Sequence, residues 1–188
     1  MNIVVLRETQ AGEARIALMP ESIKKLIALK ATVLIESGAG LGAARSDDDF
    51  REAGAEISTD RNALLESADV LAAVNRPKEE DFNRLKKGAV VIGFLRPLDE
   101  PKTLQPALTR GLTTFAVELI PRITRAQSMD ALSSMATVAG YKAVIIGAEK
   151  IPRMFPLLMT AAAPAAIMVL SLWPCTPAVR PMTAVNGL

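Results

Sequence analysis

The sequence predicts an α/β fold in which a mainly parallel, Rossmann-like sheet is flanked by helices. Short, uncharged apolar runs recur along the first two thirds of the chain, and segments with helical spacing lie between them. Strands of a parallel sheet are buried on both faces, so they read as continuous apolar runs rather than as an alternating pattern. Strands that alternate with helices favour parallel connections. We therefore expect a sheet that is covered by helices on both faces.

The individual elements are assigned from apolar runs and from helix start and stop signals. Strands are expected at residues 3–6, 32–35, 70–74, 90–95 and 113–117. Helices are expected at residues 20–29, 47–53, 61–67, 101–110 and 133–150. Pro20 suits the first turn of its helix, because proline has no N–H to leave unpaired there. Gly54 and Gly111 follow two of the helices, and glycine is typical of a helix end.

The composition excludes several functional classes. The net charge is only +2 and aromatic residues make up 4% of the chain, so no nucleic-acid partner is expected. Histidine is absent, which removes the usual general base and the usual metal ligand. The single cysteine, Cys175, excludes an internal disulfide. We expect no metal site and no signal or transit peptide, and therefore a cytoplasmic protein.

The C-terminal part of the chain has an unusual composition. Residues 154–179 carry no charge, and residues 155–173 are apolar enough to be considered as a membrane span. Pro156 and Pro164 interrupt this segment, and three further prolines follow it. A membrane span needs its backbone hydrogen bonds satisfied internally, so the prolines argue against a span here.

A polar segment at residues 118–134 is the most informative part of the sequence. It places Arg122, Arg125, Gln127, Asp130 and several hydroxyls in a short loop that leads into a helix, with apolar sequence on both sides. Such donors and acceptors suit a loop that binds a polar, anionic small molecule. A solvated loop that caps the following helix is the alternative.

Three other motifs have plain structural explanations. The glycines of residues 38–42 resemble part of a nucleotide-binding fingerprint, but the acidic residues follow too soon, so a turn is expected. Arg15 lies in a loop that also carries Glu8 and Glu13, which indicates a surface ion pair. Asn75-Arg76-Pro77 directly follows a strand, at the end of the sheet where ligands bind, although asparagine and proline also start ordinary turns.

Taken together, these segments resemble the alanine dehydrogenase and nicotinamide nucleotide transhydrogenase superfamily. The matching motifs are LRET at 6–9, EARIALMP at 13–20, ESGAG at 36–40, AGAEI at 53–57, VNRP at 74–77 and TVAGY at 137–141. Residues 121–134 (PRITRAQSMDALSS) look like the signature loop of the NAD(H)-binding component of the transhydrogenase alpha subunit. The resemblance runs from Met1 to about Ala162.

The resemblance implies a domain organisation. Residues 1–132 correspond to the N-terminal domain of the superfamily, and residues 133–150 to a connecting helix. Residues 151–188 would be the truncated or aberrant start of the second, NAD-binding domain, of which only a fragment is present. The glycine-rich phosphate-binding turn of that domain is missing, because no glycine lies between Gly147 and Gly187. A truncated or frame-shifted product and a natural short relative are both compatible with this tail.

The resemblance also implies a site, cofactors and partners. Gln127 and Asp130 match residues that act at the dihydronicotinamide, and Arg122, Gln127, Asp130 and Ser133 match the NAD(H)-binding loop. A transhydrogenase transfers hydride directly between NAD(H) and NADP(H), and needs no proton carrier at the nicotinamides. The implied partners are a second alpha subunit, giving a homodimer, and an NADP(H)-binding beta subunit. The chain would lie at the inner membrane only through partner components.

Two alternatives remain open at the level of sequence. In alanine dehydrogenases a lysine that grips the keto acid stands at the position of Asn75, and a catalytic histidine at the position of Arg96. Neither is present, which disfavours an alanine dehydrogenase-like oxidoreductase. The other alternative is a non-catalytic fragment that only assembles with an intact subunit. Without the second domain, we expect this chain to bind NAD(H) weakly or not at all.

Overall fold

A computed structural model describes residues 1–150 and 152. The chain divides into two compact units, Met1–Asp130 and Ala131–Leu188. The first unit contains a sheet, and in the described residues of the second unit the structure is a single helix.

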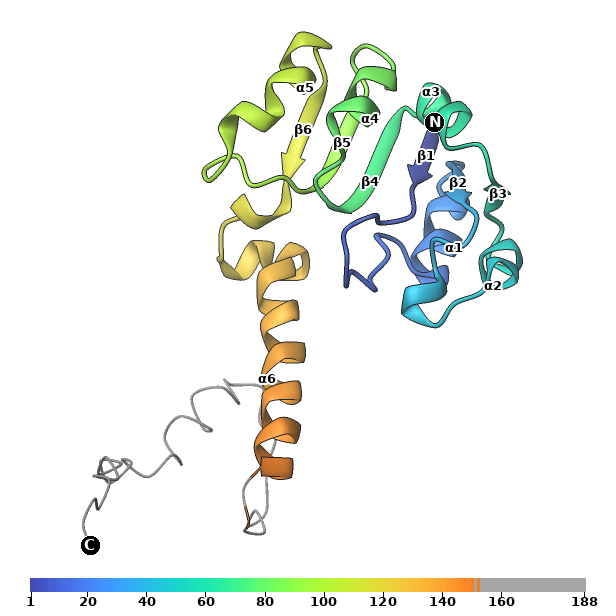
Figure 1. Cartoon of the computed structure of the whole chain (residues 1–188). Helices are drawn as coiled ribbons and strands as arrows, with labels where there is room; N and C mark the ends of the chain where they lie inside the picture. The colour runs from blue at the N-terminus through green and yellow to red at the C-terminus, as the bar shows by residue number, and fades with distance from the viewer. Residues whose placement is uncertain (151, 153–188) are drawn as a thin grey trace, which may run out of the picture. The chain divides into compact units, whose positions relative to one another are not determined.

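The described residues form a six-stranded sheet in which all neighbouring strands are parallel, with the order β3-β2-β1-β4-β5-β6 (Figure 1). The strands are β1 (Asn2–Val5), β2 (Thr32–Glu36), β3 (Glu56–Ser58), β4 (Val70–Asn75), β5 (Val90–Phe94) and β6 (Thr113–Ala116). The α/β fold with a parallel sheet is confirmed. The strand order reverses between β1 and β4. Strands β2 and β3 follow one another outwards from β1, and β5 and β6 follow one another outwards from β4 on the other side.

The α-helices of the first unit are α1 (Pro20–Ala28), α2 (Asp47–Glu52), α3 (Arg61–Ser67), α4 (Glu79–Arg84) and α5 (Gln105–Thr109). They pack on opposite faces of the sheet. Ile23 of α1 and Phe50 of α2 belong to one buried cluster, together with Val5 and Val33. A second buried cluster contains residues of α3, α4 and α5 on the other face, beneath β1, β4 and β5.

The sheet is flanked by helices on both faces. At β5 and β6, however, side chains on one face are exposed, so the burial expected for these two strands is wrong there. Ile92 of β5 lies beside Phe115 of β6 in the parallel register. These side chains are 36% and 57% exposed, and no helix of the first unit packs over them. The last strand is therefore an exposed edge strand.

Several helix boundaries differ from those expected. The segment expected as one helix at residues 101–110 is a 3-10 helix, η2 (Pro101–Leu104), followed by α5. Pro106 explains the break, because its ring and missing N–H do not fit the interior of a continuous helix. Helix α4 and strand β3 are not among the elements expected from the sequence. Helix α2 is confirmed, and Ser46 caps it by accepting a hydrogen bond from Asp49 N.

In the second unit, α6 (Ala131–Lys150) contains the helix expected at residues 133–150. Among the described residues it is the one helix long and apolar enough to cross a membrane, judged by length and composition alone. Helices that pack against another part of a soluble protein have the same properties, so this is weak evidence for a span. The segment at residues 155–173 lies outside the described residues.

Candidate functional site

The carboxyl ends of the strands bring together polar residues that are far apart in the sequence. Ligands of doubly wound sheets bind outside these ends, at the point where the strand order reverses. Here that point lies between β1, which leads to Glu8, and β4, which ends at Asn75. Small-molecule binding would therefore be expected near these two side chains.

Asn75 is held at the reversal point by two carboxylates. Its amide Nδ2 donates to Oε2 of Glu8 at 3.1 Å and to Oε2 of Glu13 at 2.9 Å. The Glu8 carboxylate also accepts from the backbone N–H of Val74 at 2.6 Å. Both N–H groups of the Asn75 amide are thus committed within the protein.

Arg15 continues this cluster from the loop between β1 and α1. Its Nε and Nη2 donate to the two oxygens of Glu13 at 2.7 and 2.6 Å, in a bidentate pair. These hydrogen bonds from Arg15 lower the pKa of Glu13 from 4.5 to about 2, and the hydrogen bond from Asn75 adds to the effect. The guanidinium also lies over the Phe94 ring, 5.8 Å from its centroid. The ion pair expected for Arg15 is confirmed, but it is part of a larger network.

A second network lies beside the first and is centred on Arg61. Its Nη2 donates to Asp81 at 2.9 Å, and its Nη1 donates to Glu36 at 2.7 Å. Glu36 in turn accepts from the backbone N–H of Arg7 at 2.8 Å. Arg61 thereby ties the ends of β1 and β2 to α3 and α4, and the cavity beside Glu8, Arg61 and Asn75 has a volume of only about 30 Å³.

The polar loop lies after β6 and contains the residues that the sequence singles out. Gln127 is part of a 3-10 helix, η4 (Thr124–Met129), which Asp130 ends. Arg122 and Gln127 are exposed, and among the described residues neither side chain has a hydrogen bond. Asp130 is 8% exposed. Ser133 is exposed in the first turn of α6, three residues after Asp130, and the role of these four residues stays a prediction.

The glycine-rich segment at residues 38–42 is a turn, as expected. Asp47 accepts hydrogen bonds from the Ser37 hydroxyl at 2.6 Å and from Gly38 N at 2.9 Å. The glycines serve packing: a Cβ at Gly40 would lie 2.3 Å from the Phe50 ring, and one at Gly42 would lie 2.8 Å from the backbone of Ala14. The segment therefore offers no free phosphate-binding turn.

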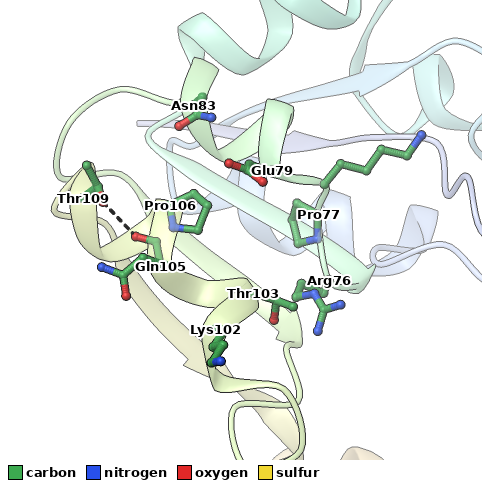
Figure 2. Close-up of a pocket in the computed structure, with 10 residues that line it drawn as sticks. Arg76, Pro77, Glu79, Asn83, Lys102, Thr103, Gln105, Pro106 and Thr109 are labelled. Atoms are coloured by element: carbon green, nitrogen blue, oxygen red, sulfur yellow. Dashed lines mark hydrogen bonds between the residues drawn. The ribbon is translucent and has the colours of Figure 1, made fainter.

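A groove that sequence reasoning does not identify lies between α4 and the η2–α5 segment (Figure 2). It has a volume of about 570 Å³, and its lining includes Arg76, Lys78, Asn83, Lys102 and Thr103. The sequence signal is Asn75-Arg76-Pro77, which by itself cannot be connected to residues of η2. The basic and amide side chains can bind an anion. No cluster of three possible metal-ligating His, Cys, Asp or Glu residues is present in the described part of the chain.

Comparison with known proteins gives consistent matches in sequence. The profile of the family "Alanine dehydrogenase/PNT, N-terminal domain" matches residues 4–139. The chain is 42% identical over 177 residues to an NAD(P) transhydrogenase alpha-subunit polypeptide of Rhodospirillum rubrum, covering 90% of this chain and 46% of that protein. It is 40% identical to NAD(P) transhydrogenase subunit alpha of Cereibacter sphaeroides, covering 90% of this chain and 33% of that protein.

Solved structures agree with these matches. The transhydrogenase from Sinorhizobium meliloti superposes with a TM-score of 0.78 at 43% identity, over 86% of this chain and 48% of that one. An L-alanine dehydrogenase superposes with a TM-score of 0.72 at 28% identity, over 79% of this chain and 40% of the other. The chain spans less than half the length of these relatives.

Proposed function

Because the chain belongs to the alanine dehydrogenase/PNT N-terminal domain family, we propose that it is the NAD(H)-binding first domain of a proton-translocating NAD(P) transhydrogenase alpha subunit. The whole enzyme would transfer hydride between NAD(H) and NADP(H). The observation that carries this proposal is the 42% identity with a transhydrogenase alpha-subunit polypeptide over 90% of the chain. The polar loop at residues 118–134 provides the side chains for it.

Three residues of that loop suit a nicotinamide. The carboxylate of Asp130 has several acceptor positions, so it can accept from the carboxamide N–H₂ in addition to contacts within the chain. Gln127 is exposed, and its amide can both donate to and accept from the ring substituent or the ribose. Arg122 can hold a phosphate or the loop itself. Ser133 is the fourth residue of the proposed set.

The nucleotide would supply the hydride, and side chains of this chain would hold the nicotinamide ring in position. Hydride transfer between two nicotinamides requires the rings to lie face to face at short distance. Asp130 and Gln127 would fix the orientation of one ring by hydrogen bonds to its carboxamide. No general base is required, which fits a sequence without histidine.

The described residues would supply only part of a dinucleotide site. The backbone N–H groups of Gly38, Ala39 and Leu41 donate to Asp47, Glu36 and Gly38, so this turn has few amides left for a pyrophosphate. The rest of the site would come from a second domain. We therefore propose that residues 133–150 connect to that domain and that the chain alone binds NAD(H) weakly.

The proposed partners follow from the same assignment. They are a second alpha subunit and an NADP(H)-binding beta subunit, and the chain would be a cytoplasmic component attached to the inner membrane through them. Residues 1–150 by themselves would assemble without catalysing hydride transfer. Size-exclusion chromatography with and without an intact alpha subunit tests this assembly.

Alanine dehydrogenation is disfavoured by the geometry at Asn75. Its amide is bound by Glu8 and Glu13, so it is not directed at a keto acid. By resemblance, Arg96 stands at the position of the catalytic histidine of alanine dehydrogenases, and a guanidinium has N–H donors but no acceptor for a substrate proton.

The test is a chimaera of residues 1–150 with the second domain of a full-length transhydrogenase relative. With the NADP(H)-binding component present, we expect hydride transfer from NADH to an NADP⁺ analogue. We expect no oxidation of NADH that depends on pyruvate and ammonia. The opposite pattern, amination without transhydrogenation, would overturn the proposal. Asn75→Lys in the same chimaera is the matched variant, because it introduces the lysine that alanine dehydrogenases carry at this position and leaves the polar loop unchanged.

A further inference from the structure

The groove between α4 and η2–α5 is separate from the polar loop. It is lined by residues 76–109, whereas the loop comprises residues 118–134. In Figure 2, Arg76, Thr103 and Lys102 lie toward one end of the groove, and Asn83 and Thr109 lie toward the other. Its volume of about 570 Å³ is in the range of small-molecule sites.

The guanidinium of Arg76 is held by one ion pair, but one of its nitrogens has no hydrogen-bond partner among the described residues. Its Nη2 donates to Glu100 at 2.8 Å, which fixes the guanidinium, while Nη1 is buried and has no hydrogen-bond partner among the described residues. Nη1 itself has almost no accessible surface, so a ligand in the groove would meet Arg76 through the rest of its side chain, which is 25% exposed.

The other groups at this end of the groove are available. Lys102 is exposed, and its ammonium has no hydrogen bond or ion pair in the described part of the chain. Lys78 is likewise without a side-chain partner within that part. Elsewhere in the groove, Asn83 and Gln105 add amide donors from the two walls. Glu79 also lines the groove and, with Glu100, offsets part of the positive charge, so binding should be weak and sensitive to salt.

From this arrangement we infer that the groove binds a small molecule bearing a phosphate group, with the phosphate between Arg76 and Lys102. A phosphate has three acceptor oxygens, which suits a guanidinium and an ammonium approaching from different elements. The lining of the groove has no aromatic side chain, so it does not suit a nucleic acid strand, which needs stacking surfaces.

The test is a titration of the full chain with inorganic phosphate and with pyrophosphate at low ionic strength, followed by two-dimensional amide NMR. We expect saturable shifts at Arg76, Lys102 and Thr103, with dissociation constants in the millimolar range. Lys102→Gln should weaken binding about two- to fivefold, as expected for one exposed charge contact. Lys24→Gln on α1 is the matched control, because Lys24 is also exposed and unpaired in the described residues.

Several outcomes would overturn the inference. Shifts that do not saturate, or that are equally large with acetate at the same ionic strength, would indicate unspecific charge screening. Equal effects of Lys102→Gln and Lys24→Gln would remove the groove from the explanation. Shifts confined to residues 118–130 would assign phosphate binding to the polar loop instead. Because the titration involves no hydride transfer, its result does not depend on the proposed function.

Discussion

Replacing Arg61 by methionine tests whether the ion pairs at the reversal point hold the carboxyl ends of the strands in place. Methionine keeps much of the side-chain volume but removes the hydrogen bonds to Asp81, Glu36 and the carbonyl of Arg7. The Asp81 side chain is only 8% exposed and the Glu36 side chain 14% exposed, so both carboxylates would be left without their cation in a poorly solvated place.

Removing one partner of a buried ion pair costs about 3–5 kcal/mol. Arg61 itself is 27% exposed, so water can enter beside it and the lower limit applies. We expect Arg61→Met to reduce the free energy of unfolding by about 3 kcal/mol, and to lower the melting temperature of a unit of this size by about 10 °C. Urea unfolding followed by circular dichroism measures the first quantity.

Two further variants make this result specific. Arg51→Met removes a surface pair with Asp48, whose partners are 56% and 80% exposed, and should cost less than about 0.5 kcal/mol. Arg61→Met combined with Asp81→Asn removes one of the uncompensated charges and should recover part of the lost stability. If Arg61→Met were no more destabilising than Arg51→Met, the network would not secure the strand ends.

Three other predictions concern the loop beside this network, the exposed sheet face and the tail. The pKa of Glu13 is lowered, so its stabilising effect is present above pH 4.5 and lost as the pH falls from 4.5 towards 2. Glu13→Gln should remove a pH-dependent contribution of about 1–2 kcal/mol to the free energy of unfolding in urea. This value is kept small because Arg15 is 44% exposed. If the unfolding free energies of both proteins changed with pH in parallel, this prediction would be contradicted. Phe115→Ser should reduce self-association measured by light scattering and should change the free energy of unfolding by less than about 1 kcal/mol. Unchanged self-association would mean that the exposed sheet face does not mediate it. Deleting residues 163–188, which carry a single charge, should raise solubility; unfolding of the first domain on deletion would show that the tail is integral.

Most of the sheet could be predicted because most of its strands are uninterrupted apolar runs. Residues 90–94 are an example: no polar residue interrupts them, and a buried parallel strand has that appearance. Strand β3 has only three residues and α4 only six, and neither provides enough residues for a periodic pattern. The exposure of Phe115 could not be predicted, because an apolar strand at the sheet edge has the same sequence pattern as a buried one.

Only part of the candidate site could be predicted from the sequence. Asn75 and Arg15 stand out in the sequence, but the Asn75 amide binds carboxylates that are 67 and 62 residues away, and no local pattern reveals such contacts. The groove depends on Arg76 and Lys102, which lie on different elements and approach each other only in the fold. The loop residues Arg122, Gln127 and Asp130 could be proposed from the sequence because they lie within one short segment, and their role stays a prediction.

The most direct test of the proposed function is hydride transfer in the chimaera carrying Gln127→Ala or Asp130→Ala. Losing one well-placed hydrogen bond to the nicotinamide should cost about 1.5–3 kcal/mol, which is about ten- to a hundredfold in rate. Gln127→Ala should leave the free energy of unfolding nearly unchanged, because Gln127 is exposed and has no hydrogen bond in the described residues. Rates and NADH affinities close to those of the unsubstituted chimaera in both variants would show that the loop is an ordinary surface element, and would contradict the proposed function.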